Sequence, residues 1–263
     1  MKRILTIFLI AMLPMMAMSQ NPITRPGKKP QKVTTHPNRA GGKAKRDNKG
    51  RSNRNNARQT VSQPTPAPPA KLLTGTINGY DWVDLGLSVK WATQNVGASS
   101  PSDYGDYFAW GETRTKSSYD WDNCFDCRKD YSWDTYKIGG KTSISPTSGH
   151  DTARENWGGT WRMPTDAEFD ELCDKCTWTW TSQGGHNGYL VTSKTNGTSI
   201  FLPAAGWRSG TDTYDGGEGG DYWSSTLGSL YSYFARILSF GSSYHHTNNY
   251  YRRIGQSVRP VTD

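Results

Sequence analysis

Residues 161–176 read WRMPTDAEFDELCDKC. Thr165 is a suitable helix N-cap, and Glu168 three residues later completes a capping box. Pro164 prevents the helix from extending toward the N-terminus. Apolar side chains then recur at helical spacing, at Phe169, Leu172, Cys173 and Cys176. The stretch therefore predicts one clear amphipathic helix.

Short apolar runs separated by Gly, Asn, Asp and Ser surround this helix in the sequence. Such runs are typical of short strands between turns. The predicted strands are residues 82–85, 89–92, 107–110, 188–191 and 199–202. A second, weaker helix is predicted at 152–156. Few helices among many short antiparallel strands and long loops indicate an α+β fold in one domain, residues 72–263.

Seven motifs in this domain resemble a known family. They are YDWVDLGL (80–87), KWATQNVGA (90–98), YGDYFAWGE (104–112), WRMPT (161–165), LPAAG (202–206), YWSS (222–225) and SVRPV (257–261). In this order they resemble the Fibrobacter succinogenes major paralogous domain family, across nearly all of residues 78–263. The resemblance implies a C-type lectin-like fold, similar to that of the formylglycine-generating enzyme group, in an exported bacterial protein. It implies no activity.

The N-terminal segment predicts export. Lys2 and Arg3 precede an apolar run from Ile4 to Met18, and small residues follow at the positions that signal peptidase reads. The pattern is that of a signal peptide, residues 1–19. The run is shorter than the about 20 apolar residues that a membrane-spanning helix needs. We therefore expect a periplasmic, cell-surface or secreted protein with no transmembrane segment after cleavage.

Residues 20–71 predict a disordered, basic and Pro-rich linker. Residues 21–60 hold twelve Lys or Arg and one acid, Asp47, so their net charge is +11. The whole chain carries +8, of which the signal peptide holds +2, so residues 61–263 carry −5. In an exported protein such a linker is either a solvated spacer or a ligand of anionic envelope polymers, and nucleic acid is not an expected partner.

Tryptophan divides into two groups. Most indoles within the motifs are expected in the core, since short strands need large side chains between them. Flat rings in loops can instead stack on sugar rings. The candidate ligand-binding residues of this second kind are Trp121, Tyr131, Trp133, Trp178, Trp180, Trp207, Tyr214 and Tyr244.

Arg259, near the chain end, is expected to form a structural ion pair.

Four cysteines form two C-x-x-C pairs, Cys124 with Cys127 and Cys173 with Cys176. Two such pairs can hold zinc, but the gap between them is much longer than in zinc ribbons. Export favours two disulfides instead, with three connectivities open.

Two acidic clusters are candidate calcium sites, because carboxylates on flexible loops suit this ion. The first is Asp120, Asp122 and Asp126. The favoured second cluster, among glycines, is Asp212, Asp215, Glu218 and Asp221.

The sequence favours a binding or adhesion module over an enzyme, because no nucleophile elbow, HExxH helix or phosphate-binding loop occurs. The expected partner is a glycan or a host or bacterial surface protein. The alternative is a polysaccharide hydrolase that uses paired carboxylates, which need only meet in space. A carboxylate with a strongly raised pKa in a deep cleft would favour the hydrolase, and exposed flat aromatics would favour the module.

Overall fold

The computed structural model describes residues 73–124, 143–228 and 233–263. All of them lie in the second of two units into which the chain divides, Thr65–Asp263. The predicted signal peptide and linker fall within residues 1–72, outside the described part of the chain.

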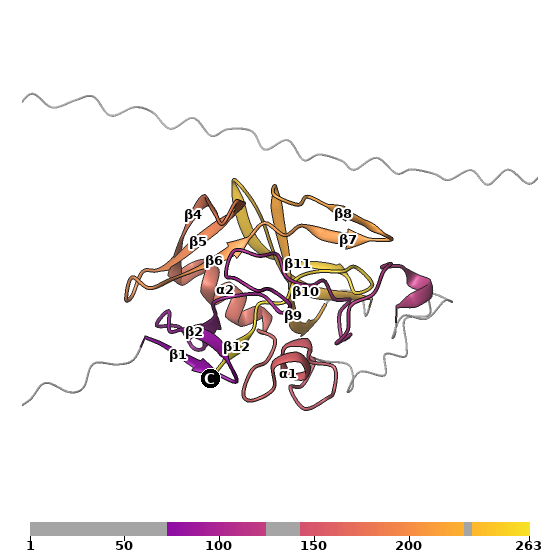
Figure 1. The fold of residues 1–263 in the computed structure, drawn as a ribbon, viewed down its shortest axis with the longest axis horizontal. Helices are drawn as coiled ribbons and strands as arrows, with labels where there is room; N and C mark the ends of the chain where they lie inside the picture. The colour runs from indigo at the N-terminus through magenta and orange to yellow at the C-terminus, as the bar shows by residue number, and fades with distance from the viewer. Residues whose placement is uncertain (1–72, 125–142, 229–232) are drawn as a thin grey trace, which may run out of the picture. The chain divides into compact units, whose positions relative to one another are not determined.

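The described strands form four antiparallel sheets (Figure 1). One sheet has the order β1 (Thr74–Ile77), β2 (Tyr80–Val83), β3 (Lys90–Ala92), β12 (Val261–Thr262). The second joins β11 (Tyr244–Tyr251), β10 (Phe234–Gly241) and β9 (Gly219–Leu227), and the third joins β4 (Cys176–Gln183), β5 (His186–Ser193) and β6 (Ser199–Pro203). The fourth is the hairpin of β7 (Trp207–Ser209) and β8 (Asp212–Tyr214).

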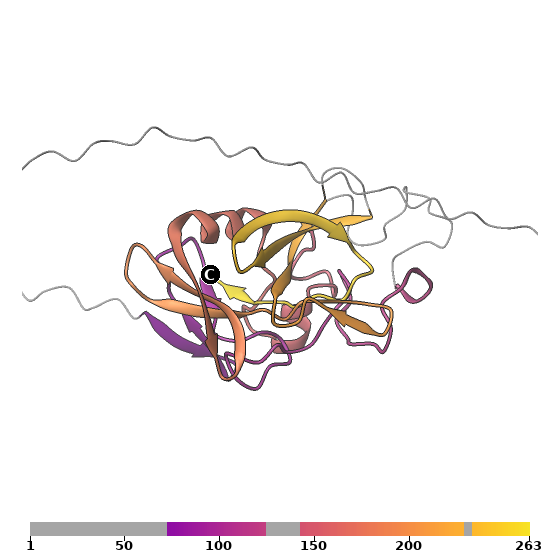
Figure 2. The ribbon, with the colours of Figure 1, turned by 90° about the horizontal axis from the view of Figure 1, so that it is seen from above.

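Helices are few in the described residues. They are α1 (Thr152–Trp157), α2 (Asp166–Lys175) and a 3₁₀ turn, η1 (Trp121–Asn123). Seen from above, α2 lies beside β11, and it also contacts β9 and β10 (Figure 2). The predicted α+β class with short antiparallel strands is confirmed.

The capping box predicted for α2 is present. The Thr165 hydroxyl accepts a hydrogen bond from the Glu168 amide at 3.3 Å, and the Glu168 carboxylate accepts one from the Thr165 amide at 2.7 Å. Phe169 and Leu172 are fully buried, as the spacing predicts. The helix ends at Lys175, and Cys176 instead begins β4, where Thr and Trp alternate with the two-residue period of a strand.

The predicted strand at 107–110 is wrong, because Phe108 forms only an isolated bridge, with Gln256. The sequence reading also missed the β9–β11 sheet. Successive residues of β9 and β10 pack into different core clusters: Tyr222 and Leu238 into one, Trp223 and Ile237 into the other. Strands β9 and β10 are therefore buried on both faces and lack the alternation of apolar and polar residues that identifies a half-buried strand, whereas β11 is polar and partly exposed.

The motif tryptophans are core residues. Trp91, Trp161 and Trp223 are fully buried. Arg259 is fully buried as well, but the expected ion pair is wrong. Its guanidinium donates to the Asn95 side chain at 2.8 Å and to the carbonyls of Ala92 and Phe201 at 3.0 and 2.9 Å.

The cysteine expectation is wrong for the second pair, because Cys173 and Cys176 are both free. Cys176 points into the core from the start of β4, while Cys173 lies on α2. Burial raises their pKa values to about 11 for Cys176 and about 12 for Cys173. Both thiols therefore stay protonated at neutral pH and are poor nucleophiles there. Cys124 is disulfide-bonded, and Cys127 lies outside the described residues.

Candidate ligand-binding groove

An open groove of about 700 Å³ lies where four parts of the fold meet. Its lining comes from β4 and β5, from β7, from the 215–221 segment that leads into β9, and from the β10–β11 hairpin. Five aromatic residues line it: Trp180, Trp207, Phe240, Tyr244 and Tyr250. Three carboxylates line it as well: Asp215, Glu218 and Asp221. We call this surface the aromatic–acidic groove.

The β7–β8 hairpin holds Trp207 at the groove. In this hairpin Trp207 pairs with Tyr214, and their rings stack at 4.4 Å between centroids with 17° between planes. Gly206, just before β7, has a φ of +65°, and a Cβ there would lie 1.9 Å from the Tyr214 carbonyl oxygen. Only glycine fits this approach, so Gly206 determines how the hairpin leaves the domain.

Trp180 and Tyr244 approach the groove from other strands. Trp180 of β4 packs edge-on against Tyr189 and Phe240, with centroids 5.1 and 6.5 Å away. Tyr244 begins β11 and is 48% exposed. Trp180 therefore rests on buried rings, whereas Tyr244 is open to a ligand.

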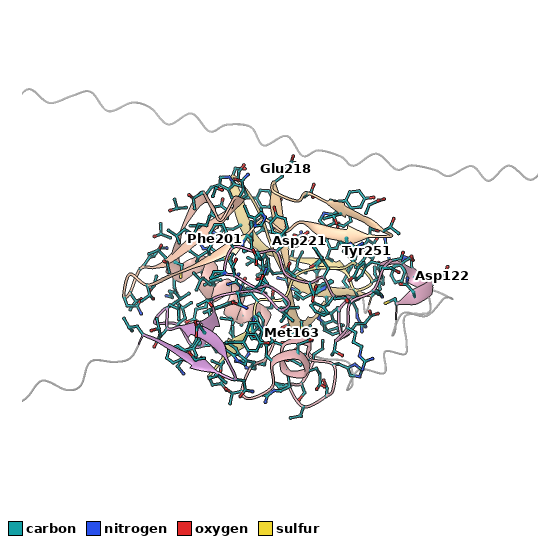
Figure 3. All side chains as sticks on the ribbon, viewed as in Figure 1. Asp122, Met163, Phe201, Glu218, Asp221 and Tyr251 are labelled. Carbon is teal, nitrogen blue, oxygen red and sulfur yellow. The ribbon has the colours of Figure 1, made fainter. Side chains whose placement is uncertain are left out.

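The three carboxylates lie at different depths. Glu218 is exposed, and Asp221 is only 8% exposed; Figure 3 shows Glu218 at the upper edge and Asp221 nearer the middle of the domain. Asp215 accepts a hydrogen bond from the Trp207 indole nitrogen at 2.9 Å. This bond fixes the indole and a carboxylate relative to each other.

Burial raises the pKa of Asp221 to about 6, and the nearby charge of Asp215 adds to the effect, against a hydrogen bond from Ser239 that lowers it. Burial, Asp221 and Asp215 together raise the pKa of Tyr250 to about 12. The Tyr250 hydroxyl therefore stays protonated at neutral pH and can donate a hydrogen bond. The groove thus presents a donor beside acceptors.

Asp221→Asn is expected to stabilise the protein at neutral pH. Because the folded chain binds the Asp221 proton more tightly than the unfolded chain, the wild-type free energy of unfolding falls as pH rises from about 4 to about 6. Asparagine does not ionise, so the variant should be more stable by about 2 to 3 kcal/mol above pH 6 and equal to wild type below pH 4.

Urea unfolding at several pH values measures this difference. The same change at Asp212, which is exposed on β8 and does not line the groove, is the control, with an effect within about 0.5 kcal/mol. An Asp221→Asn variant no more stable than wild type at pH 7.5 would contradict the assignment.

The groove gathers many of the predicted site residues. Six of them line it: Trp180, Trp207, Tyr244, Asp215, Glu218 and Asp221. Tyr214 stacks on Trp207 without lining the groove, and Asp212 lies on the same hairpin. The sequence reading missed Asn187 and Tyr250, which also line it. Tyr250 belongs to the same polar run as the predicted Tyr244, YHHTNNYY, in which nothing distinguishes it as a site residue.

Other predicted residues lie elsewhere. Trp178 stacks on His245 at 4.4 Å and packs against the core, so it is structural. Trp121 lies on η1 next to Arg253 and Tyr251. Tyr131, Trp133 and Asp126 are outside the described residues. Asp120 accepts a hydrogen bond from Ser118 at 2.5 Å, and Asp122 is exposed beside it.

The described residues contain no group of three or more His, Cys, Asp or Glu side chains arranged to hold a metal ion. The expected calcium site therefore stays a prediction, which the binding experiment below tests with a chelator.

Comparison with known proteins gives no match from which the function of the groove could be inferred. No family model, curated protein or solved structure matches this chain. None of the helices in the described ranges is long and apolar enough to cross a membrane. The groove offers aromatic faces, hydrogen-bond acceptors and a tyrosine donor on one concave surface.

Proposed function

We propose that this chain is an exported glycan-binding module and that the aromatic–acidic groove is its binding site. The observation that carries the proposal is the placement of Trp207, hydrogen-bonded to Asp215, in the same groove as Trp180. Both indoles were candidates for sugar stacking on sequence grounds alone.

The groove chemistry suits a sugar. Apolar faces of sugar rings stack on indole and phenol rings, while ring hydroxyls need acceptors and donors close by. Carboxylates accept bonds from hydroxyl groups, and the protonated Tyr250 hydroxyl can donate one. The volume, about 700 Å³, falls within the usual range for small-ligand sites.

We further propose that the domain belongs with the Fibrobacter succinogenes major paralogous domains and has their lectin-like fold. In support, residues of three of the motifs are buried in the domain: Trp161 and Met163 of WRMPT, Tyr222 and Trp223 of YWSS, and Arg259 of SVRPV. The signal-peptide pattern supports export, and the basic segment 21–60 would then attach to anionic envelope polymers or act as a spacer.

A hydrolase is the second candidate, and the buried Asp221 favours it. Its pKa of about 6 is near that of a general acid at neutral pH, and Asp215 would be the second carboxylate. The two candidates share a site but differ in whether the sugar is cleaved.

One experiment separates them. The full chain is titrated calorimetrically with a panel of oligosaccharides, with calcium and with chelator, and the sugars are then analysed by mass. Saturable binding with intact sugars supports the module, and loss of binding in chelator supports calcium. Shortened sugars support the hydrolase. If no sugar in a broad panel binds, the proposed function is wrong.

A further inference from the structure

The charge of the aromatic–acidic groove has a single sign. All three charged side chains that line it are acidic, and no Lys, Arg or His of the described residues is part of the lining. Arg253 acts on Tyr250 electrostatically, but it is hydrogen-bonded to the Tyr119 carbonyl and the Ser209 hydroxyl outside the groove. An acidic sugar would therefore be repelled.

Asp221 is the least solvated of these charges. The groups that act on its carboxylate are Ser239, by a hydrogen bond, and Asp215, by repulsion. Neither supplies a positive charge. Attraction between opposite charges is stronger in a partly buried site than in water. A cation would therefore be attracted more strongly to Asp221 than to an exposed carboxylate.

The aromatic rings of the groove also favour a positively charged ligand. A ring face attracts an ammonium group within about 6 Å of its centroid, and indole is the strongest such partner. Trp207 and Tyr250 lie with ring centroids 5.7 Å apart in the groove, near Asp215 and Asp221. A ligand that carries a cationic group on a ring with an apolar face would use the aromatic rings and the carboxylates together.

We propose that the groove selects sugars that carry a protonated amino group over neutral and acidic sugars. The inference rests on the proposed glycan-binding function and specifies its ligand class. An aminohexose presents a ring for stacking, hydroxyls for hydrogen bonds and an ammonium group for the carboxylates. A charged hydrogen bond of this kind corresponds to a preference of about tenfold or more in affinity.

The test uses four tetrasaccharides that differ in charge. They are a glucosamine tetramer, its N-acetylated counterpart, a glucose tetramer and a galacturonic acid tetramer, each titrated into the full chain by calorimetry at about pH 6.5 and low salt. Binding that Trp207→Ala abolishes is binding at the groove and not at the basic segment 21–60. For this binding the expected order is the glucosamine tetramer first, by about tenfold, and the galacturonic acid tetramer last. Added salt should reduce the preference, because screening weakens charge attraction.

Matched variants connect the preference to the groove. Asp221→Asn and Asp215→Asn should reduce the ratio of glucosamine to N-acetylglucosamine affinities toward one, whereas Asp212→Asn removes the same charge outside the groove and should leave the ratio unchanged. Two variants at different depths keep the test valid if one fails to fold. A ratio that survives both variants overturns the proposal.

The outcomes distinguish this inference from the proposed function. Equal or tighter binding of the neutral or acidic tetramers overturns amine selection and leaves glycan binding intact. No binding of any tetramer counts against both. A peptide with the sequence of residues 43–58, from the chain's own basic segment, is the competing ligand. If it binds more tightly than the glucosamine tetramer, the site accepts basic side chains and the proposal for sugars is wrong.

Discussion

Arg259→Ala should lower the free energy of unfolding by about 3 to 5 kcal/mol, a large part of the total for a domain of this size. The guanidinium is fully buried and donates to three acceptors: the Asn95 side chain and the Ala92 and Phe201 carbonyls. Truncation leaves these acceptors without their donor and leaves a cavity, and each buried unsatisfied group costs about 1 to 3 kcal/mol. Burial of the Arg259 charge is itself unfavourable and lowers the pKa of Arg259 to about 10. Removing the charge therefore offsets part of this loss.

Urea unfolding of the purified chain measures the effect. Arg259→Lys is informative because lysine carries the charge but cannot reach three acceptors in a fork, so it should also destabilise. Arg114→Ala, at an exposed position, is the control and should change stability by less than about 0.5 kcal/mol. A loss below 1 kcal/mol for Arg259→Ala would contradict the structural role.

Trp207→Ala should weaken sugar binding by about thirtyfold or more, the effect of losing about 2 kcal/mol at an aromatic anchor. The change removes the stacking face, the contact with Tyr214 and the hydrogen bond that positions Asp215. The fold should persist, because Trp207 is only partly buried, on the short β7–β8 hairpin.

Trp121→Ala is the matched control for this experiment. Trp121 is also partly buried, but it packs against Arg253 and Tyr251 and does not line the groove. Calorimetric titration of both variants with the same sugar should show a loss for Trp207→Ala alone. An equal loss in both variants would place the binding site elsewhere.

Structural features formed by residues close together in the sequence could be predicted from local signals. The capping box of Thr165 and Glu168 located α2. The acids Asp215, Glu218 and Asp221, predicted as calcium ligands, and Trp207, predicted as a sugar-stacking residue, lie together in the groove. Features that depend on distant segments were not predictable. Arg259 bonds to Asn95, 164 positions away, and the burial of Asp221 depends on how β9 pairs with β10. The two-sided burial of β9 and β10 also removed the periodic pattern that identifies strands.

The central claim is that sugar occupies the aromatic–acidic groove, and indole NMR tests it most directly. The chain has eleven tryptophans, whose indole N–H signals can be assigned with single Trp→Phe variants. On titration with a bound oligosaccharide, the signals of Trp180 and Trp207 should shift together and saturate. The signals of the fully buried Trp91, Trp161 and Trp223 should stay in place. Saturable shifts that spare Trp180 and Trp207 would contradict the account.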